Sequence, residues 1–395
     1  MKLLYLIKAF AEKGGVERVI CDKMNYFVKQ GHTIIFVTYI QGNHLLPYKL
    51  NPSICHYDIN TRFFELGKYK FIRRIIEHIK LRSIFKNRLQ EIIDKTQPDI
   101  IISTTFQFGL TDIISSLQTK ATKLIESHIG FEQILFSEIH KNKGLLSRLS
   151  IIPDLYFLTK TKKFDALITL TNEDAKEWRK HIHNVYVIPN PVTNYLNEIP
   201  EKHIENCQRI ICVGRLAKQK GFDLLIKAFS MISNQCPQWH IDIYGHGEDK
   251  EELYNMIKES GLQEQIIINQ PTNDIYSEYL NSAFLVLSSR HEGFPLVLNE
   301  AMSCGIPCIA FTCKYGPKDA IIHKKNGLLV ENGNIKELAE SMLWMINHPI
   351  ERIEMGKAAR KASAMYRKEI IMQKWEELFK SYTSIRINNQ HNSNE

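Results

Sequence analysis

Short apolar stretches alternate with amphipathic segments along the whole chain. Stretches rich in Ile, Leu and Val predict buried strands, and a helical repeat of apolar residues fills most of the intervals between them. Strands that are apolar on both faces, with helices between them, are typical of a parallel sheet covered by helices on both sides. We therefore predict doubly wound α/β folding, with strands at residues 3–7, 33–39, 54–59, 99–103, 123–126, 166–170, 185–188, 209–213, 240–244, 265–268, 283–287, 307–311 and 327–330.

A pair of prolines interrupts this alternation near the middle of the chain. Pro189 and Pro191 flank Asn190, and such a segment can continue neither a helix nor a central strand. The 395 residues suffice for two domains, each with its own hydrophobic core. The sequence predicts a first domain over residues 1–188, a second over 189–366, an amphipathic helix over 367–387 and a disordered tail over 388–395.

The composition, with 44% hydrophobic and 24% charged residues, is that of a globular protein. No apolar run is long enough to span a bilayer, and the N-terminal apolar stretch is short and ends at Lys8. We interpret that stretch as a strand and not as a signal peptide. The eight cysteines show no CxxC spacing, which indicates reduced thiols in a cytoplasmic protein.

Positive charge gathers between Arg62 and Arg88, where nine Lys and Arg residues oppose only Glu65 and Glu77. Apolar residues recur there at helical spacing, which predicts a basic amphipathic helix or helix pair. Such a segment can be a solvated outer face, or it can contact anionic lipid headgroups at the inner face of the plasma membrane. The sequence leaves both interpretations open. Nucleic acid is a poorer candidate partner, because no binding motif is present.

Two glutamates frame the start of a helix that follows the predicted strand 283–287. Glu292 lies in the loop and Glu300 in the second turn, with Pro295 suited to the first helical position. A glycine-containing loop that leads into a helix directs backbone N–H groups and the positive helix end at one point, which suits an anion. Acidic residues beside an anion are expected where they bind hydroxyl groups of the same ligand. A phosphate with sugars on both sides, a nucleotide-sugar, meets these requirements.

Three further segments carry polar groups directly after predicted strands. Gly14-Gly15 opens a helix, where paired glycines allow a phosphate to approach the backbone. Arg215 and Lys220 can both reach one diphosphate, and His128 follows a strand of the first domain. Considered alone, each segment also has a plain structural interpretation. Gly14-Gly15 is then a simple turn, Arg215 and Lys220 are solvated surface charges, and His128 is a structural histidine. Ligands of such sheets bind beyond the carboxyl ends of the strands, so we expect the site in a cleft between the domains.

In this order and spacing, the four segments resemble glycosyltransferase family 4, a group of retaining enzymes with the two-domain GT-B fold. The run from Glu292 to Glu300 is similar to the E-x7-E element of that family, and Gly214-Arg215…Lys220-Gly221 and Gly14-Gly15-Val16-Glu17 support it. The resemblance covers nearly the whole chain and extends to a bacterial subgroup that builds capsule, O-antigen and other surface polysaccharides. It implies two Rossmann-like domains that face each other across a cleft, and a C-terminal helix that crosses back to the first domain.

The resemblance also implies roles for individual residues. Glu300 is expected to bind the nucleotide ribose and Glu292 the donor sugar, while Arg215 and Lys220 hold and stabilise the leaving diphosphate. His128 matches the position that contacts the donor sugar near its reacting carbon. The other implied donor contacts, to phosphate or base, are Gly14, Gly15, Gly293, Phe294, Pro295, Leu296, Val297, Gln270 and Pro271. Gln270 departs from the pattern, because many family members have glycine there.

The implied reaction moves a hexose or N-acetylhexosamine, with retention, from a nucleotide-sugar (UDP-linked) to a glycan or lipid-linked glycan acceptor. No Asp-x-Asp motif is present, so we expect no metal site and no cofactor beyond the nucleotide-sugar itself. One alternative is a nucleotide-sugar epimerase of GT-B-like fold, which needs no acceptor. Another is a catalytically silent scaffold. A dinucleotide dehydrogenase is not favoured, because no G-x-G-x-x-G follows the first strand.

Overall fold

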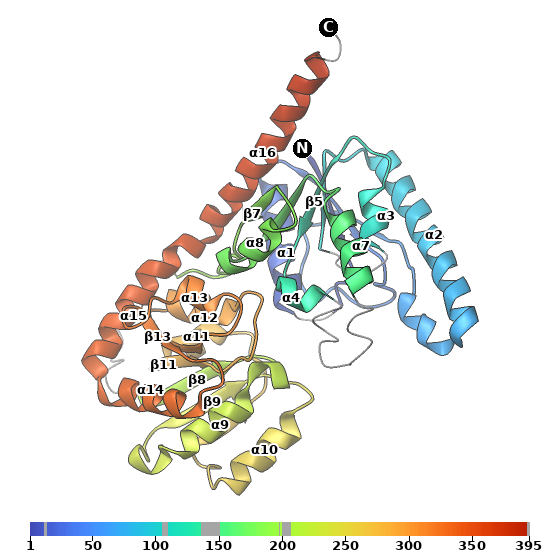
Figure 1. Cartoon of the computed structure of the whole chain (residues 1–395). Coiled ribbons are helices and arrows are strands. Elements are labelled where there is room, and N and C mark those ends of the chain that lie inside the picture. The colour runs from blue at the N-terminus through green and yellow to red at the C-terminus, as the bar shows by residue number, and fades with distance from the viewer. Residues whose placement is uncertain (12–13, 105–109, 136–150, 197, 200–206, 393–395) are drawn as a thin grey trace. The chain divides into compact units, whose positions relative to one another are not determined.

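The computed structural model describes residues 1–11, 14–104, 110–135, 151–196, 198–199 and 207–392 (Figure 1). The chain forms two compact units: Met1–Ile188 together with Met372–Glu395, and Pro189–Ile371. Each unit is built around one parallel sheet. Within the described residues, we find no helix that combines the length and the apolar character needed to cross a membrane.

The first unit contains a seven-stranded sheet in the order β3-β2-β1-β4-β5-β6-β7. β1 pairs in parallel with both β2 and β4, so it lies at the point where the strand order reverses. The strands are β1 (Lys2–Ile7), β2 (Thr33–Thr38), β3 (Cys55–Asp58), β4 (Ile100–Ser103), β5 (Thr122–Glu126), β6 (Ala166–Thr169) and β7 (Val185–Val187). The helices are α1 (Gly15–Lys29), η1 (Phe63–Lys68), α2 (Phe71–Thr96), α3 (Thr111–Ser115), α4 (Phe131–Ile134), α7 (Ile151–Thr161) and α8 (Asn172–Arg179).

The last helix, α16 (Lys368–Asn392), returns to this first unit after the chain has built the second. Phe379 of α16 packs on Phe27 of α1, with 5.3 Å between ring centroids. The Tyr382 hydroxyl donates a 3.0 Å hydrogen bond to the Asp165 carbonyl before β6. The C-terminal helix therefore supplies part of the core of the N-terminal unit.

The second unit contains a six-stranded sheet in the order β10-β9-β8-β11-β12-β13, with β8 and β11 at the reversal point. The strands are β8 (Arg209–Val213), β9 (His240–Tyr244), β10 (Ile266–Asn269), β11 (Phe284–Leu287), β12 (Cys308–Phe311) and β13 (Gly327–Val330). The helices are η3 (Lys218–Lys220), α9 (Phe222–Ser230), η4 (Ser233–Gln235), α10 (Lys250–Glu259), α11 (Ile275–Leu280), α12 (Leu296–Ser303), α13 (Pro317–Ala320), α14 (Ile335–Asn347), α15 (Pro349–Ser363) and η5 (Ala364–Tyr366).

The central strands of both sheets are buried on both faces, as their continuous apolar sequence predicts. All four residues of β4, β11 and β12 are buried, and the apolar side chains of the sheet and its helices form one core cluster in each unit. The predicted α/β class, the two Rossmann-like units and the returning C-terminal helix are confirmed.

Two details differ from the sequence-based expectations. Helix α16 runs to Asn392, so the prediction of a disordered tail from residue 388 is wrong for 388–392, and 393–395 lie outside the described residues. No proline or glycine interrupts that stretch, and asparagine costs a helix only a fraction of a kcal/mol per residue, so the helix continues. Pro295 is the N-cap of α12 and not its first residue, because its ψ of 91° is extended.

Candidate active site

The predicted polar residues of the second unit follow β8 and β11, the two strands at the reversal point of its sheet. Arg215 and Lys220 follow β8, and Glu292 and Glu300 follow β11. Helices that leave adjacent strands at such a point turn to opposite faces of the sheet, which opens a crevice at their carboxyl ends. The topology therefore brings two segments, about 70 residues apart in the chain, to one place.

Lys220 and Glu292 form an ion pair at this edge of the sheet. Lys220 Nζ lies 2.6 Å from Glu292 Oε1, and the side chains are only 19% and 6% exposed. The Ser289 hydroxyl donates a second hydrogen bond of 2.6 Å to the same oxygen. The Glu292 backbone is held as well, because its N–H donates to the Lys314 carbonyl and its carbonyl accepts from the Tyr315 N–H. Glu292 is thus a fixed acidic group in contact with a fixed cation.

A close backbone contact positions the Lys220 loop against the strand end of β11. Gly221 has a φ of +65°, and a Cβ at this position would lie 2.0 Å from the Ser288 carbonyl oxygen. Only glycine fits such a position without movement of the backbone. The Ser288 hydroxyl also donates to the Lys220 carbonyl at 3.0 Å.

A second contact between these loops was not apparent from the sequence. Arg290 Nη1 and Nη2 donate to the two carboxylate oxygens of Asp223 at 2.8 and 2.7 Å, and Nη1 also donates to the Lys218 carbonyl. These hydrogen bonds, opposed in part by burial, lower the pKa of the Asp223 carboxyl below its ordinary value. Arg290 therefore clamps the loop after β11 onto the first turn of α9.

Arg215 stays accessible at the end of β8. Its side chain is exposed, and within the described ranges its guanidinium has neither an ion pair nor a hydrogen bond. Its backbone is fixed by the loop after β9, since a Cβ on Gly245 would lie 1.9 Å from the Gly214 carbonyl oxygen and one on Gly247 2.3 Å from that of Leu216. Arg215 is therefore a cation on a rigid backbone, and its guanidinium is accessible to a ligand.

Glu300 is buried on α12 and receives a hydrogen bond of 3.2 Å from the Tyr279 hydroxyl of α11. Burial, and next the charge of Glu300, raise the pKa of Tyr279 well above its ordinary value, so the hydroxyl remains a donor. Sequence reasoning did not identify Tyr279, because nothing near it in the sequence points to a glutamate 21 residues away.

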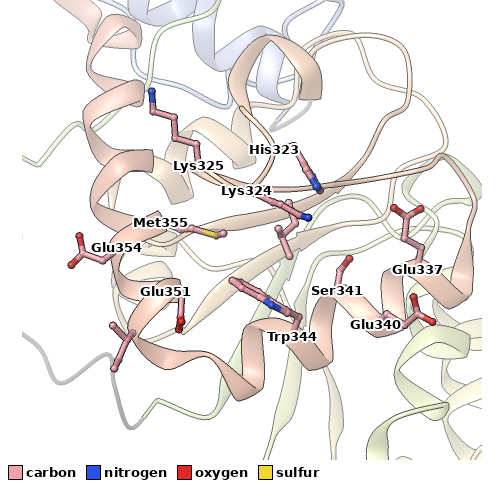
Figure 2. Close-up of a pocket in the computed structure, with 12 residues that line it drawn as sticks. His323, Lys324, Lys325, Glu337, Glu340, Ser341, Trp344, Glu351, Glu354 and Met355 are labelled. Carbon is pink, nitrogen blue, oxygen red and sulfur yellow. The ribbon is translucent and has the colours of Figure 1, made fainter.

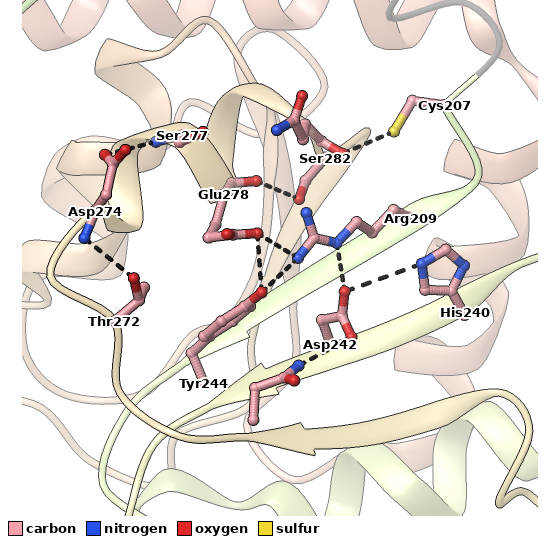
Figure 3. A network of polar contacts seen from close by, with 12 residues as sticks. Cys207, Arg209, His240, Asp242, Tyr244, Thr272, Asp274, Ser277, Glu278 and Ser282 are labelled. Atoms are coloured by element: carbon pink, nitrogen blue, oxygen red, sulfur yellow. Dashed lines mark hydrogen bonds and ion pairs between the residues drawn. The ribbon is translucent and has the colours of Figure 1, made fainter.

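A polar network fixes α11 to the sheet (Figure 3). Arg209 at the start of β8 donates to Glu278 of α11 at 2.6 Å and to the Tyr244 hydroxyl at 2.7 Å, and it also pairs with Asp242. The Tyr244 hydroxyl donates to the same Glu278 oxygen at 2.8 Å. Because Glu278 and Tyr279 are neighbours on α11, this network also holds the Tyr279 ring in place.

The remaining donor residues predicted in the second unit surround these groups. Gly293, Leu296 and Val297 are partly exposed, whereas Phe294 and Pro295 are buried. Helix α12 begins at Leu296, and the first N–H groups of a helix have no acceptor within it. Gln270 and Pro271 directly follow β10 and are both exposed.

In the first unit, Gly14 is the N-cap of α1 and the exposed Gly15 is its first residue. The Glu17 carboxylate folds back over this helix start, because a Cβ on Gly14 would lie 2.1 Å from Glu17 Oε2. A carboxylate is favourable at the positive end of a helix. A phosphate at Gly14-Gly15 would need the Glu17 side chain to rotate away.

His128 lies in the loop after β5 and is nine-tenths buried. Its Nε2 is 3.2 Å from Glu126 Oε1, and its side chain is 6% exposed. That contact lacks the geometry of a hydrogen bond, and neither ring nitrogen has a hydrogen-bond partner in the part of the chain that the structure describes. The Glu126 carboxylate is in turn paired with Lys23 of α1.

A cavity of about 710 Å³ lies elsewhere in the second unit, over β13 and between α14 and α15 (Figure 2). Trp344 and Met355 line its apolar part, and charged groups such as Lys324 and Glu351 line its edge. None of the residues predicted for the donor site lines it. Across the described ranges, no group of three or more His, Cys, Asp and Glu residues has the arrangement to hold a metal ion.

Two family models together match most of the chain. The model described as Glycosyltransferase Family 4 matches residues 13–195, and the model described as Glycosyl transferases group 1 matches residues 197–362. The chain belongs to the family 4 glycosyltransferases. The predicted enzyme class, a hexosyl-type glycosyltransferase with the GT-B fold, is therefore confirmed.

Several glycosyltransferases are similar to this one over nearly its whole length. An uncharacterized glycosyltransferase of Haemophilus influenzae is 29% identical over 95% of this chain and 98% of its own. The amylovoran biosynthesis glycosyltransferase AmsD of Erwinia amylovora is 26% identical over 95% and 99%. The lipopolysaccharide 1,6-galactosyltransferase of Salmonella typhimurium is 26% identical over 89% and 91%.

Solved glycosyltransferases share the fold. A TarM variant of S. aureus, crystallised with Fondaparinux, alpha-GlcNAc-glycerol and UDP, superposes with a TM-score of 0.75 at 18% identity, over 96% of this chain and 100% of that chain. HepE of Anabaena, in complex with UDP, gives a TM-score of 0.72 at 19% identity, over 96% and 100%.

Proposed function

We propose that this enzyme transfers a hexose or N-acetylhexosamine from a UDP-sugar, with retention, to a glycan or lipid-linked glycan in surface polysaccharide biosynthesis. The names of the Erwinia and Salmonella relatives support the pathway, and the UDP in the TarM and HepE structures supports the donor. The observation that carries the proposal is the Lys220–Glu292 ion pair at the β8–β11 reversal point, with the accessible Arg215 on the same loop as Lys220.

In this proposal the two cations hold the diphosphate and stabilise it as it leaves. Arg215 offers a planar fork to phosphate oxygens, and Lys220 offers a point charge that its ion pair keeps in place. Fixed cations are most effective where negative charge develops in the transition state. Glu292, whose Oε2 is not engaged by Lys220 or Ser289, binds hydroxyl groups of the donor sugar.

We assign the nucleoside end of the donor to Glu300 on α12 and to the residues that follow β10. Glu300, held by Tyr279, accepts from the ribose hydroxyls, and Gln270 and Pro271 lie against the base. The backbone N–H groups at Phe294, Leu296 and Val297 complete the phosphate contacts at the helix start. From the first unit, we assign Gly14 and Gly15 to the phosphate and His128 to the sugar.

The proposed chemistry is a front-face transfer. The bond between the anomeric carbon and the phosphate oxygen breaks, the acceptor oxygen bonds to the same face of that carbon, and the acceptor proton passes to the leaving phosphate oxygen. Protein cations take the part that a divalent ion plays in other enzymes. We therefore expect equal turnover with and without EDTA, and a loss of turnover in EDTA that Mg²⁺ restores would contradict this part of the proposal.

The test is an assay of the purified chain with UDP-sugars and glycan acceptors, preceded by a thermal-shift screen that identifies the donor by its stabilisation. Lys220→Met should lower kcat by roughly 100-fold or more, because a leaving-group contact made in the transition state is lost. Lys218→Met is the matched control, since Lys218 is an exposed residue of the same loop and pairs with the exposed Glu252. Equal kcat values for the two variants would refute the assigned role.

The epimerase alternative is not supported, because both family models and the relatives named above are glycosyltransferases. Incubation of the enzyme with donor alone separates the two reactions. A transferase leaves the donor unchanged apart from slow hydrolysis, whereas an epimerase converts it. The anomeric configuration of the transferred sugar, read by NMR coupling constants, tests retention.

We also propose that the basic segment between Arg62 and Arg88 contacts an anionic membrane at the cytoplasmic face. The second half of α2 is anchored by buried residues such as Phe85 and Leu89, but its first turns are exposed: Phe71 is 81% and Ile72 74% accessible. Further exposed apolar residues of this face are Ile75, Ile76 and Ile79. Lys68, Lys70, Arg73 and Arg74, also exposed, lie among them. Apolar and cationic groups mixed on one helix are typical of interfacial binding.

Sedimentation with vesicles tests this contact. The enzyme should bind vesicles that contain phosphatidylglycerol and not pure phosphatidylcholine, and high salt should weaken the binding because it screens the cations. Ile72→Ser with Ile76→Ser should abolish it, whereas Ile267→Ser, at an exposed isoleucine of the second unit, should not. Equal binding to both vesicle types would refute the proposal.

A further inference from the structure

A fully buried ion pair lies in the first unit, beneath the loop that carries His128. Lys23 Nζ donates to both carboxylate oxygens of Glu126, at 2.7 and 2.6 Å, and each side chain is 1% exposed. Lys23 comes from the middle of α1 and Glu126 is the last residue of β5. Desolvation of two charges is costly, so a pair of well-packed apolar side chains would often stabilise the fold as well or better. The pair therefore calls for an explanation other than stability.

The C-terminal helix closes the other side of the lysine. Lys23 Nζ lies 3.6 Å from the centre of the Trp375 ring, and Trp375 on α16 is itself 1% exposed. An ammonium group over an indole face is attracted by the ring electrons, and the attraction is stronger where water is excluded. Lys23 is thus held between the Glu126 carboxylate and a ring from the end of the chain.

The third member of the group is His128, two residues after Glu126. Its Nε2 lies 3.2 Å from Glu126 Oε1, the oxygen that Lys23 also binds. The loop around it is rigid, because the Ser127 hydroxyl donates to the Ile129 carbonyl and the Phe131 N–H donates to Asp174 at 2.7 Å. Both imidazole nitrogens are buried and have no hydrogen bond to any described residue. Buried polar atoms of this kind are normally satisfied, so they indicate a place for a ligand.

We propose that Lys23 and Trp375 are positioning residues that act through Glu126 to orient His128 toward the donor sugar. This inference rests on the proposed function, in which His128 contacts that sugar. Burial alone would favour the uncharged form of Glu126, and the adjacent cation reverses this preference. The carboxylate then remains charged and fixed in two directions, and its charge holds the imidazole ring on one side. In this proposal Nδ1, which has no hydrogen-bond partner among the described residues, binds a hydroxyl group of the sugar.

The pKa values of the pair agree with this geometry. Burial acts to raise the pKa of Glu126, but the charge of Lys23, with a further contribution from the neighbouring His128, outweighs it and lowers the pKa to about 2. Burial lowers the pKa of Lys23, and Glu126 opposes that change. The Glu126 carboxyl is therefore ionised at neutral pH, as the orientation of His128 requires.

The first test compares variants of Lys23 with a matched control. Lys23→Met should lower kcat by about 10–100-fold and change the donor KM by less than about threefold, because the displaced group acts mainly in the transition state. Lys123→Met is the control, since the Lys123 ammonium, on the same strand β5, donates to the backbone carbonyls of Ser115 and Leu117. Trp375→Phe, which retains a ring, should preserve most of kcat, and Trp375→Leu should not.

Epistasis separates positioning from a general structural effect. In a His128→Ala background, Lys23→Met should cost less than about threefold in kcat, because the residue through which it acts is already absent. If Lys23→Met alone does not fold, the neutral variant Lys23→Met with Glu126→Gln removes the uncompensated charge and is measured instead. Equal losses of kcat in the wild-type and His128→Ala backgrounds would overturn the proposal.

A spectroscopic readout keeps this test independent of the proposed function. The ring resonances of His128 in ¹⁵N-histidine-labelled enzyme are assigned by their loss in His128→Ala. They should shift in Lys23→Met and in the neutral double variant but not in Lys123→Met. Unchanged His128 resonances would refute the coupling whether or not sugar transfer is observed. Shifted resonances in an enzyme that transfers no sugar would keep the coupling and refute the proposed function.

Discussion

The close backbone contact of Gly221 in the candidate site gives the sharpest prediction. Gly221 has a φ of +65° and would place a Cβ 2.0 Å from the Ser288 carbonyl oxygen. Gly261, after α10, has nearly the same φ of +67°, but a Cβ there meets no atom within 4 Å. The two glycines therefore share the same backbone strain and differ only in the space around them. Gly221→Ala and Gly261→Ala form a matched pair.

The magnitudes follow from this difference. A left-handed conformation costs a non-glycine residue roughly 1–2 kcal/mol, and both variants bear that cost. Real Cβ atoms do not come closer than 3.0 Å to other heavy atoms, so in Gly221→Ala the backbone must move by about 1 Å. This adds roughly 1–3 kcal/mol, as overpacking does elsewhere. Because Lys220 precedes Gly221, the same shift disturbs the Lys220–Glu292 contact, and a displacement of about 1 Å can cost 100-fold in rate.

Chemical denaturation and steady-state kinetics check both expectations. Gly261→Ala should lose about 1–2 kcal/mol of unfolding free energy and keep the wild-type kcat. Gly221→Ala should be less stable than Gly261→Ala and should lose on the order of 100-fold in kcat. If the two variants have the same stability and the same kcat, the Ser288 contact does not position Lys220, and the reasoning from the Gly221 backbone fails.

Three further predictions follow from the contacts of the second unit. Tyr279→Phe should weaken UDP-sugar binding roughly tenfold in calorimetry, because Glu300 loses a buried hydrogen-bond donor, whereas Tyr254→Phe at an exposed site should bind normally. Arg290→Met should lower the unfolding free energy at neutral pH by about 1–2 kcal/mol, because the Asp223 carboxylate loses its partner. Since the folded-state pKa of Asp223 lies below 3.8, the stability from this pair is present above that pH and is lost as the pH falls further. Acid titration of unfolding should therefore show a smaller loss below pH 3.8 in Arg290→Met than in the wild type, and parallel curves would contradict this assignment.

The strands and their parallel arrangement could be predicted because their signal is local. Ile100–Ser103 and Phe284–Leu287, for example, are buried on both faces, and a continuous apolar run in the sequence predicts that burial. The ends of the elements were harder to predict, because a helix can stop or continue at positions where no single residue determines its end. The continuation of α16 to Asn392 through a polar segment is one such case.

The site was predictable only in part, for a related physical reason. Residues that follow a parallel strand must lie at its carboxyl edge, so the sequence could place Lys220 and Glu292 at one edge. It could not show that they pair with each other, and it assigned them to different parts of the ligand. The clamp between Arg290 and Asp223 was not predicted at all, because its partners are 67 residues apart and nothing in the sequence around them indicates that they pair.

Large distances along the sequence also explain why the residues that support the site are harder to predict than the residues that form it. Lys23 and Glu126 are 103 residues apart, and Trp375 comes from the far end of the chain. Such groups meet only once the sheet has formed and α16 has returned to the first unit. A residue that orients a ligand contact can therefore lie anywhere in the sequence, whereas one that touches the ligand must follow a strand. Sequence motifs identify the second kind, and the first kind requires the packed structure.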